Sequence, residues 1–276
     1  MNPELLSQPR HETVFEKDLE MPMRDGTILR GDLTRPEAEG PFPVLVERTP
    51  YNKDGASENA VGSPRFFASR GYAVVIQDVR GRCASDGDFQ PFRDDGAGVN
   101  RDGYDTVEWL AAQPWCNGRV GMIGGSYSGA TQYQAALSRP PHLRALFVRE
   151  SSADYQREWV YRDGAFELGF STAWARTVTG MNIEHLAEGA ELERQRKLLR
   201  KVGEEMEDWF GRLPVYPCRF LEGLSDWHNV WLEHPEAGPF WDEFNIEPYH
   251  DQVETPAYHQ GWWFDSVLAG TLKNYT

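Results

Sequence analysis

The chain has 276 residues, 40% of them hydrophobic, and a net charge of −15, so it can bury a sizeable core. The negative charge, with no basic run, argues against nucleic acid and anionic membrane surfaces as partners. No stretch is long and apolar enough to span a membrane, and residues 1–4 lack the basic and apolar regions of a signal peptide. The three cysteines fit neither a disulfide framework nor a zinc site, and together these features predict a cytoplasmic globular protein.

The first elements in chain order are extended. Residues 13–35 predict a β-hairpin around the turn Met23–Thr27. The apolar runs at residues 44–46 and 72–76 predict two buried strands. The second run leads into Asp78, Arg80 and Arg82. These three side chains favour a structural ion-pair network, and substrate contact is the alternative because functional loops follow strands in α/β folds.

Helices and strands alternate in the next part of the chain. Helical spacing of apolar residues predicts a helix over 105–113, and the following predicted elements are a strand (119–123), a helix (130–137) and a strand (143–148). Short apolar runs that alternate with helices are typical of β-α units and a mostly parallel sheet.

The most informative segment is the glycine-rich junction between the strand that ends near Gly124 and the helix that follows Gly129. Ser126 stands at this junction with small neighbours, as a nucleophile elbow requires, because the sharp turn forces its backbone into a rarely populated conformation. The helix that follows points its N-terminus at the place where negative charge develops during acyl transfer. An ordinary glycine-rich β–α turn with a surface serine is the alternative.

The β-α alternation stops between about residues 154 and 251. Residues 154–159 and 186–206 predict helices, and five prolines break the segment after residue 213 into short pieces. The loss of β-α alternation, together with these helices and prolines, predicts a helical cap inserted before a last strand near residues 255–260. The many tryptophans suit either an aromatic-lined pocket or packing between cap helices.

Five motifs occur in an order that resembles the cocaine esterase/X-prolyl dipeptidyl-peptidase (CocE/NonD, S15-like) group of α/β-hydrolases. They are Glu47–Lys53, Gln77–Gly87, Tyr104–Trp115 with its Tyr-Asp, Trp-Leu and Gln-Pro-Trp pieces, Gly118–Gly129 with the elbow in the form Gly-x-Ser-Tyr-x-Gly, and Gly261–Asp265. The resemblance implies an α/β-hydrolase fold with an inserted helical cap. It divides the chain into a core of residues 1–152 and 253–276 and a cap of residues 153–252.

The resemblance also implies the roles of the site residues. Ser126 would be the nucleophile and Asp265 the acid of the triad, although a carboxylate that caps a helix near residue 266 is the alternative for Asp265. The oxyanion hole would take the backbone N–H of Tyr127 and the hydroxyl of Tyr51, for which a partly buried structural role is the alternative. No metal or organic cofactor is implied, because a serine triad needs none.

The triad histidine of such enzymes follows the acid along the chain, whereas all seven histidines here precede Asp265. We therefore expect the chain to be the N-terminal portion of a larger enzyme, or a truncated product, that stops before the last strand and a C-terminal jelly-roll domain. We expect these 276 residues alone to have little hydrolytic turnover.

Three functions remain open at this stage. The first is a serine hydrolase that cleaves esters or amides of small acyl groups through a Ser126 acyl-enzyme in the complete protein. The second is an X-Pro dipeptidyl aminopeptidase or α-amino acid ester hydrolase/acylase, in which cap carboxylates such as Asp154 and Glu158 could hold a substrate ammonium. The third is a non-catalytic ligand-binding fragment. The expected partner is a small-molecule ester or amide, and a homo-oligomer is compatible with the sequence.

Overall fold

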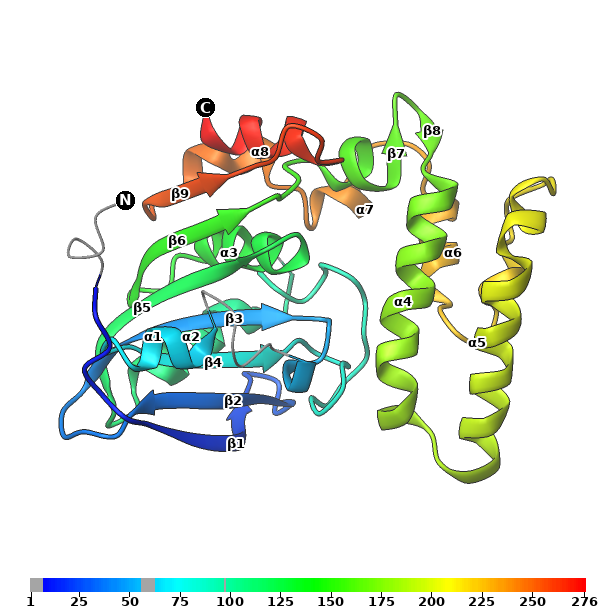
Figure 1. Ribbon diagram of the computed structural model, residues 1–276. Coiled ribbons are helices and arrows are strands. Elements are labelled where there is room, and N and C mark those ends of the chain that lie inside the picture. The colour runs from blue at the N-terminus through cyan, green and yellow to red at the C-terminus, as the bar shows by residue number, and fades with distance from the viewer. Residues whose placement is uncertain (1–6, 56–62, 97) are drawn as a thin grey trace. The chain divides into compact units, whose positions relative to one another are not determined.

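The computed structural model describes residues 7–55, 63–96 and 98–276 (Figure 1); the predicted absence of a signal peptide concerns residues 1–4, which lie outside this range. The contacts divide the chain into two compact units. Unit 1 comprises residues up to 149 together with 251–260, and unit 2 comprises residues 150–250 and 261–276. The division expected from the sequence, with boundaries at residues 152 and 253, assigns residues 261–276 to the core and so differs from these units. That division stays a prediction.

Unit 1 contains a seven-stranded sheet in the order β1-β2-β4-β3-β5-β6-β9. The strands are β1 (Thr13–Pro22), β2 (Ile28–Pro36), β3 (Phe42–Thr49), β4 (Ala73–Asp78), β5 (Cys116–Gly125), β6 (Leu143–Arg149) and β9 (Ala257–Gln260). Strands β4, β3, β5, β6 and β9 run parallel, and the antiparallel hairpin β1–β2 joins β4 at one side. The predicted hairpin and the mostly parallel sheet are therefore confirmed.

The helices of unit 1 cover this sheet. They are the short 3-10 turn η2 (Lys53–Gly55), α1 (Pro64–Ala68), α2 (Asp102–Ala111) and α3 (Tyr127–Leu137). Helices α2 and α3 pack against each other along β5, and α1 packs on β4 and β2. Strand β4 is buried at every position, which explains why its sequence reads as a continuous apolar run rather than as an alternating one.

A buried ion-pair network joins β3, the loop after β4 and α2. Arg48 is fully buried, and its guanidinium lies 2.8 Å from Asp95 and 4.0 Å from Asp102. Arg80 donates to both carboxylate oxygens of Asp102, at 2.9 and 2.7 Å, and to Asp25 in the β1–β2 turn at 2.7 Å. Buried charges need such partners because leaving water is costly for each of them.

Unit 2 is mainly helical. Its elements are η3 (Gln156–Val160, a single π-turn), the two-residue strands β7 (Tyr161–Arg162) and β8 (Ala165–Phe166), α4 (Leu168–Leu186), α5 (Gly189–Phe210), η4 (Arg219–Leu221), α6 (Trp227–Glu233), α7 (Pro239–Asp242), η5 (Glu247–Gln252) and α8 (Leu268–Tyr275). Residues 251 and 252 at the end of η5 are assigned by their contacts to unit 1. No helix in the described part of the chain is long and apolar enough to cross a membrane.

The predicted helix over 186–206 corresponds to α5, which is shifted by a few residues, whereas α4 was not predicted. Helix α4 contains a Thr-Val-Thr run and Gly180, residues that lower helix propensity. Its apolar positions do not form one stripe, because it contacts α5, α6 and η4 together. A helix that packs against neighbours on several sides lacks the amphipathic period by which a sequence reveals it.

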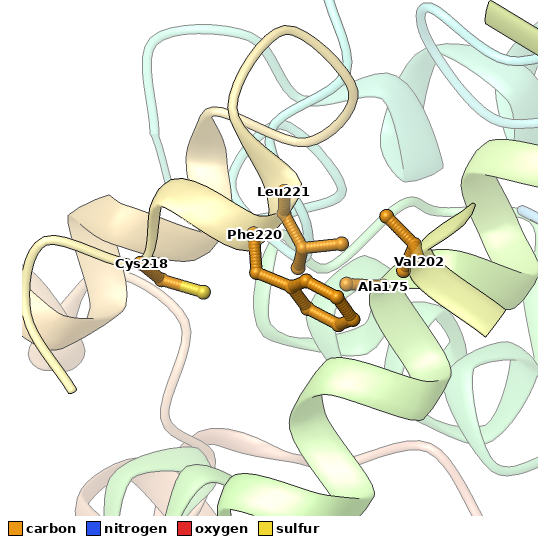
Figure 2. Close-up of a cluster of buried hydrophobic side chains, with 5 residues drawn as sticks. All are labelled: Ala175, Val202, Cys218, Phe220 and Leu221. Carbon is orange, nitrogen blue, oxygen red and sulfur yellow. The ribbon is translucent and has the colours of Figure 1, made fainter. Parts of the chain in front are cut away.

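Apolar contacts hold the helices of unit 2 together. One cluster brings Ala175 of α4 and Val202 of α5 against Cys218, Phe220 and Leu221 (Figure 2). A second group consists of tryptophans: Trp174 lies 5.7 Å from Trp159 and 5.9 Å from Trp231, measured between ring centroids. These rings pack on one another, which agrees with the second of the two alternatives for the tryptophans, packing between cap helices.

We expect Asp102→Ala to destabilise unit 1 by about 3–5 kcal/mol, because it leaves the buried guanidinium of Arg80 without its bidentate partner. Urea unfolding followed by circular dichroism measures the change. The control is Glu254→Ala, which removes the exposed partner of Arg139 and should leave the midpoint within error. An unchanged midpoint for Asp102→Ala would show that the buried guanidinium of Arg80 does not depend on this carboxylate.

Candidate active site

The junction between β5 and α3 has the backbone that a nucleophile elbow needs. Ser126 has φ 56° and ψ −121°, a region that non-glycine residues rarely occupy, and such strain costs on the order of 1–3 kcal/mol. Hydrogen bonds on both sides hold it: the Ser126 N–H donates to the carbonyl of Arg149 at 3.0 Å, and the Ser126 carbonyl accepts from Gly129 and Ala130 at 2.9 and 3.1 Å. The predicted strand, turn and helix around Ser126 are thus present.

Small residues make this turn possible. Gly124 has φ 135°, and a Cβ placed on it would lie 2.4 Å from the Cβ of Ser128. A Cβ on Gly125 would lie 3.2 Å from the Cβ of Arg149. Glycine is therefore required at 124 for both conformation and space, and serine is small enough at 128 for the strand to approach the first turn of the helix.

Tyr127 anchors the elbow from within the core. Its hydroxyl accepts from the N–H of Phe92 at 2.8 Å and donates to Asp95 at 3.2 Å, and its ring stacks on Phe92 with centroids 4.4 Å apart. Burial raises the pKa of Asp95 to about 6, against the opposing charge of Arg48. Because the side chain of Tyr127 is fixed, its backbone N–H is fixed as well, at the helix N-terminus where N–H groups point outward.

Tyr51 lies in the loop after β3, and the loop after β4 holds it in place. The Nε of Arg82 donates to the carbonyl of Pro50 at 2.8 Å, and the carboxylate of Asp78 accepts from the N–H of Lys53 at 2.8 Å. Burial raises the pKa of Asp78 to about 6, although that N–H bond opposes the shift. The Tyr51 side chain is half-buried, which is compatible with both of its sequence-based roles.

These contacts refine the predicted ion-pair network. Arg80 has the expected carboxylate partners, whereas Asp78 accepts from backbone N–H groups, those of Lys53 and Ala84. Arg82 donates to a carbonyl and lies over the ring of Phe89. The network prediction is confirmed for Arg80. Asp78 and Arg82 also bond backbone groups of the loop after β3, and these bonds join the two loops.

Asp265 lies in unit 2, just before α8. Its Oδ1 accepts from the N–H of Val267 at 3.1 Å. This is a local turn contact before α8, whose N-cap residue is Val267 and which has no side-chain cap hydrogen bond. Its Oδ2 is buried and has no hydrogen-bond partner among the described residues. A buried carboxylate oxygen without a donor is costly, so Oδ2 is an acceptor that the described residues leave without a hydrogen bond.

Two histidines of unit 1 have hydrogen-bond partners within that unit. His142 bonds Glu108 at 2.8 Å, and His259 on β9 bonds the hydroxyl of Tyr133 at 3.0 Å. In unit 2 His228 is fully buried, with neither ring nitrogen bonded within the described chain, and burial lowers its pKa to about 4. Its neutral ring packs at the edge of Phe166.

The cap carboxylates named from the sequence are engaged within unit 2. Glu158 accepts from the N–H groups of Ala153 and Asp154 and pairs with Lys273 at 3.0 Å. Asp154 accepts from the N–H of Arg157 at 2.9 Å. Both carboxylates are buried, so neither is a solvated helix position. Among the described residues, no group of three or more histidine, cysteine, aspartate or glutamate side chains is placed to hold a metal ion.

Sequence reasoning assigned no role to two charged residues beside the elbow. Glu47 at the end of β3 and Arg149 at the end of β6 stand on the strands that flank β5. Burial raises the pKa of Glu47, while the hydroxyl of Ser128 and the charge of Arg149 oppose the shift. The signal in the sequence was an acidic residue directly after the apolar run Val44–Val46.

Comparisons with known proteins agree on one group. The sequence profile of the X-Pro dipeptidyl-peptidase (S15) family matches residues 25–276. The cocaine esterase of Rhodococcus sp. (strain MB1 Bresler) is 34% identical over 260 residues, which are 92% of this chain and 45% of that protein. A CocE/NonD family hydrolase from Staphylococcus aureus aligns with a TM-score of 0.67 and 25% identity over 89% of this chain and 40% of that one.

The fold extends to more distant structures. An aminopeptidase from a marine sediment archaeon, Thaumarchaeota archaeon, superposes with a TM-score of 0.71 at 24% identity, covering all of this chain and 48% of that one. The expected α/β-hydrolase fold is confirmed by these likenesses. The chain spans about half the length of the relatives that it matches.

We expect Gly124→Ala to lower the thermal unfolding midpoint and to disturb α3, because the new Cβ would overlap Ser128 at a positive φ; the cost should exceed about 1 kcal/mol. Differential scanning calorimetry measures it. Gly55→Ala is the matched control, since no atom of the described residues lies within 4 Å of its Cβ position and its φ is not positive. Equal midpoints for the two variants would contradict the account of the elbow.

Proposed function

Because the chain belongs to the X-Pro dipeptidyl-peptidase (S15) family, whose relatives found here are hydrolases, we propose that the complete protein is a serine hydrolase. It would cleave esters or amides of small acyl groups through an acyl-enzyme on Ser126. The observation that carries the proposal is the left-handed backbone of Ser126 at the start of α3. A strained serine that the surrounding hydrogen bonds maintain is typical of a nucleophile elbow.

The proposed reaction begins with attack of Ser126 Oγ on the substrate carbonyl. A base must take the serine proton, since a serine hydroxyl is a weak nucleophile by itself. In the complete protein this base would be a histidine oriented by Asp265, whose Oδ2 has no donor within the described chain. All seven histidines of this sequence precede Asp265, and the proposal takes none of them as the base.

The developing oxyanion would be stabilised by the backbone N–H of Tyr127 and by the hydroxyl of Tyr51. The core contacts of the Tyr127 side chain support a fixed backbone N–H at that residue. The bond that Arg82 donates to the Pro50 carbonyl and the bond that Asp78 accepts from the Lys53 N–H support a fixed loop around Tyr51. Donors that need no reorganisation during the reaction are the ones that lower its barrier.

The aminopeptidase and amino acid ester hydrolase alternatives need a carboxylate to hold a substrate ammonium. The two buried cap carboxylates, Asp154 and Glu158, already accept backbone N–H groups, so no specific observation favours these alternatives. Turnover of p-nitrophenyl butyrate against a proline p-nitroanilide would separate them. The small-molecule partner, a homo-oligomer and a cytoplasmic location stay predictions.

A fluorophosphonate probe should label the complete protein, and Ser126→Ala should abolish labelling and lower kcat by about 10⁴–10⁶-fold, because the covalent step is lost. Ser138→Ala, at the opposite end of α3, is the control and should label normally. Labelling that survives in Ser126→Ala would falsify the assignment of the nucleophile.

Tyr51→Phe in the complete protein should lower kcat by about 10²–10³-fold with little change in KM, because the hydroxyl acts only on the transition state. Steady-state kinetics with p-nitrophenyl esters measure both constants. Tyr258→Phe, an exposed tyrosine on β9, is the matched control. A Tyr51→Phe variant with unchanged kcat would leave Tyr51 with a structural role.

A further inference from the structure

A cavity lies on one face of the sheet, at the side where the hairpin β1–β2 joins β4 (Figure 1). Its volume is about 390 Å³, within the range of small-molecule sites. The sheet forms the floor. Phe15 of β1 stands directly opposite Thr34 of β2, and Asp32 of β2 stands directly opposite Ile76 of β4. Residues paired in this way share a face, so three neighbouring strands supply one continuous surface.

Two short elements form the walls of the cavity. Helix α1 contributes Pro64 and Arg65, and η2 contributes Lys53 and Asp54. Helix α1 has only five residues and packs on β4 and β2, while Phe15 on β1 is 61% exposed. The ring of Phe15 therefore gives the cavity an apolar surface against which another ring can pack.

The lysines at the cavity are already paired. Nζ of Lys53 lies 2.6 Å from Asp18 and 2.9 Å from Asp32. Asp54 lies 3.2 Å from both Lys53 and Lys17. The Lys53 side chain is buried, and these carboxylates compensate its loss of hydration. The charge cluster therefore ties η2 to the hairpin, and its role is structural.

Two other polar side chains that line the cavity have no partner among the described residues. The guanidinium of Arg65 makes no hydrogen bond or ion pair there, and neither does the hydroxyl of Thr34, a residue that is only 7% exposed. A buried hydroxyl without a partner costs free energy, and a guanidinium offers five N–H donors. Because both groups can donate and one is a cation, an anionic acceptor complements them.

We propose that this cavity is a binding site for a small aromatic carboxylate. The carboxylate accepts from Arg65 and from the Thr34 hydroxyl, and the ring lies against Phe15 and Ile76. A planar guanidinium matches a carboxylate with two parallel N–H donors, and the apolar floor complements a ring. The site uses neither Ser126 nor Tyr51, so it does not rest on the proposed function.

The test titrates the complete protein with 2-naphthoate and, separately, with 2-naphthamide, which keeps the ring and replaces the carboxylate with a neutral amide. Isothermal titration calorimetry at low salt measures both dissociation constants. The carboxylate should bind about fivefold more tightly or better, since one accessible ion pair contributes up to about 1 kcal/mol. Equal dissociation constants, or no saturable binding of 2-naphthoate, would overturn the proposal.

Variants of the two unpaired groups assign the preference to the cavity. Arg65→Met should remove the preference for the carboxylate, and Arg65→Lys should keep part of it because the charge remains without the planar fork. Thr34→Val should weaken 2-naphthoate binding. Arg119→Met, which changes an exposed arginine on β5 that does not line the cavity, is the control and should bind like the wild type. A preference that survives in Arg65→Met contradicts the proposal.

The apolar half of the site has its own variant. Phe15→Ala should weaken both ligands by the same factor, about threefold or more, and leave their ratio unchanged, because the ring contact is common to both. Arg65 and Phe15 are exposed, so the thermal unfolding midpoints of their variants should match the wild type. Unchanged affinities in Phe15→Ala would show that the ring does not lie in this cavity and would reject the site.

A last measurement separates the cavity from the elbow, where a carboxylic acid is the product of the proposed hydrolysis. Protein labelled at Ser126 by a fluorophosphonate should keep its preference for 2-naphthoate. A preference that disappears on labelling would locate the ligand at Ser126 and overturn the cavity site alone. A protein that does not label but shows the Arg65-dependent preference would refute the hydrolase proposal and support the cavity site.

Discussion

The left-handed backbone of Ser126 is the constraint on which the rest of unit 1 depends. A serine held at φ 56° is strained, and it persists only where the surroundings leave it no alternative. Three features do so: a glycine at 124 that permits the approach of Ser128, the hydrogen bond from Ser126 to the carbonyl of Arg149, and the buried side chain of Tyr127. Each comes from a different element, so the elbow ties β5, β6 and α3 to one another.

The anchor of the elbow continues into the buried ion pairs. Tyr127 donates to Asp95, Asp95 pairs with Arg48, and the same arginine approaches Asp102, which binds Arg80. A buried network of this kind adds little net stability, but it makes each partner expensive to remove. Its consequence here is positional, because it fixes α2, β3 and the loop after β4 around the start of α3.

In unit 2 the same reasoning applies to Asp265. Its two carboxylate oxygens differ: Oδ1 has a local donor, and Oδ2 is buried with no donor in the described chain. An orphaned acceptor of this kind is rare in a finished core. The relatives that the chain matches are about twice its length.

The sequence by itself determined the strands, the turn at Ser126 and the helix behind it, because an elbow needs small residues within a few positions of one another. Helix α4 was missed, since its burial on several sides erases the amphipathic period. The facing of Glu47 and Arg149 was decided only by the tertiary structure. These residues lie far apart in the chain, and the strand order β3-β5-β6 brings them together. A one-dimensional pattern encodes which residues are buried, but the pairing of strands decides which charges meet.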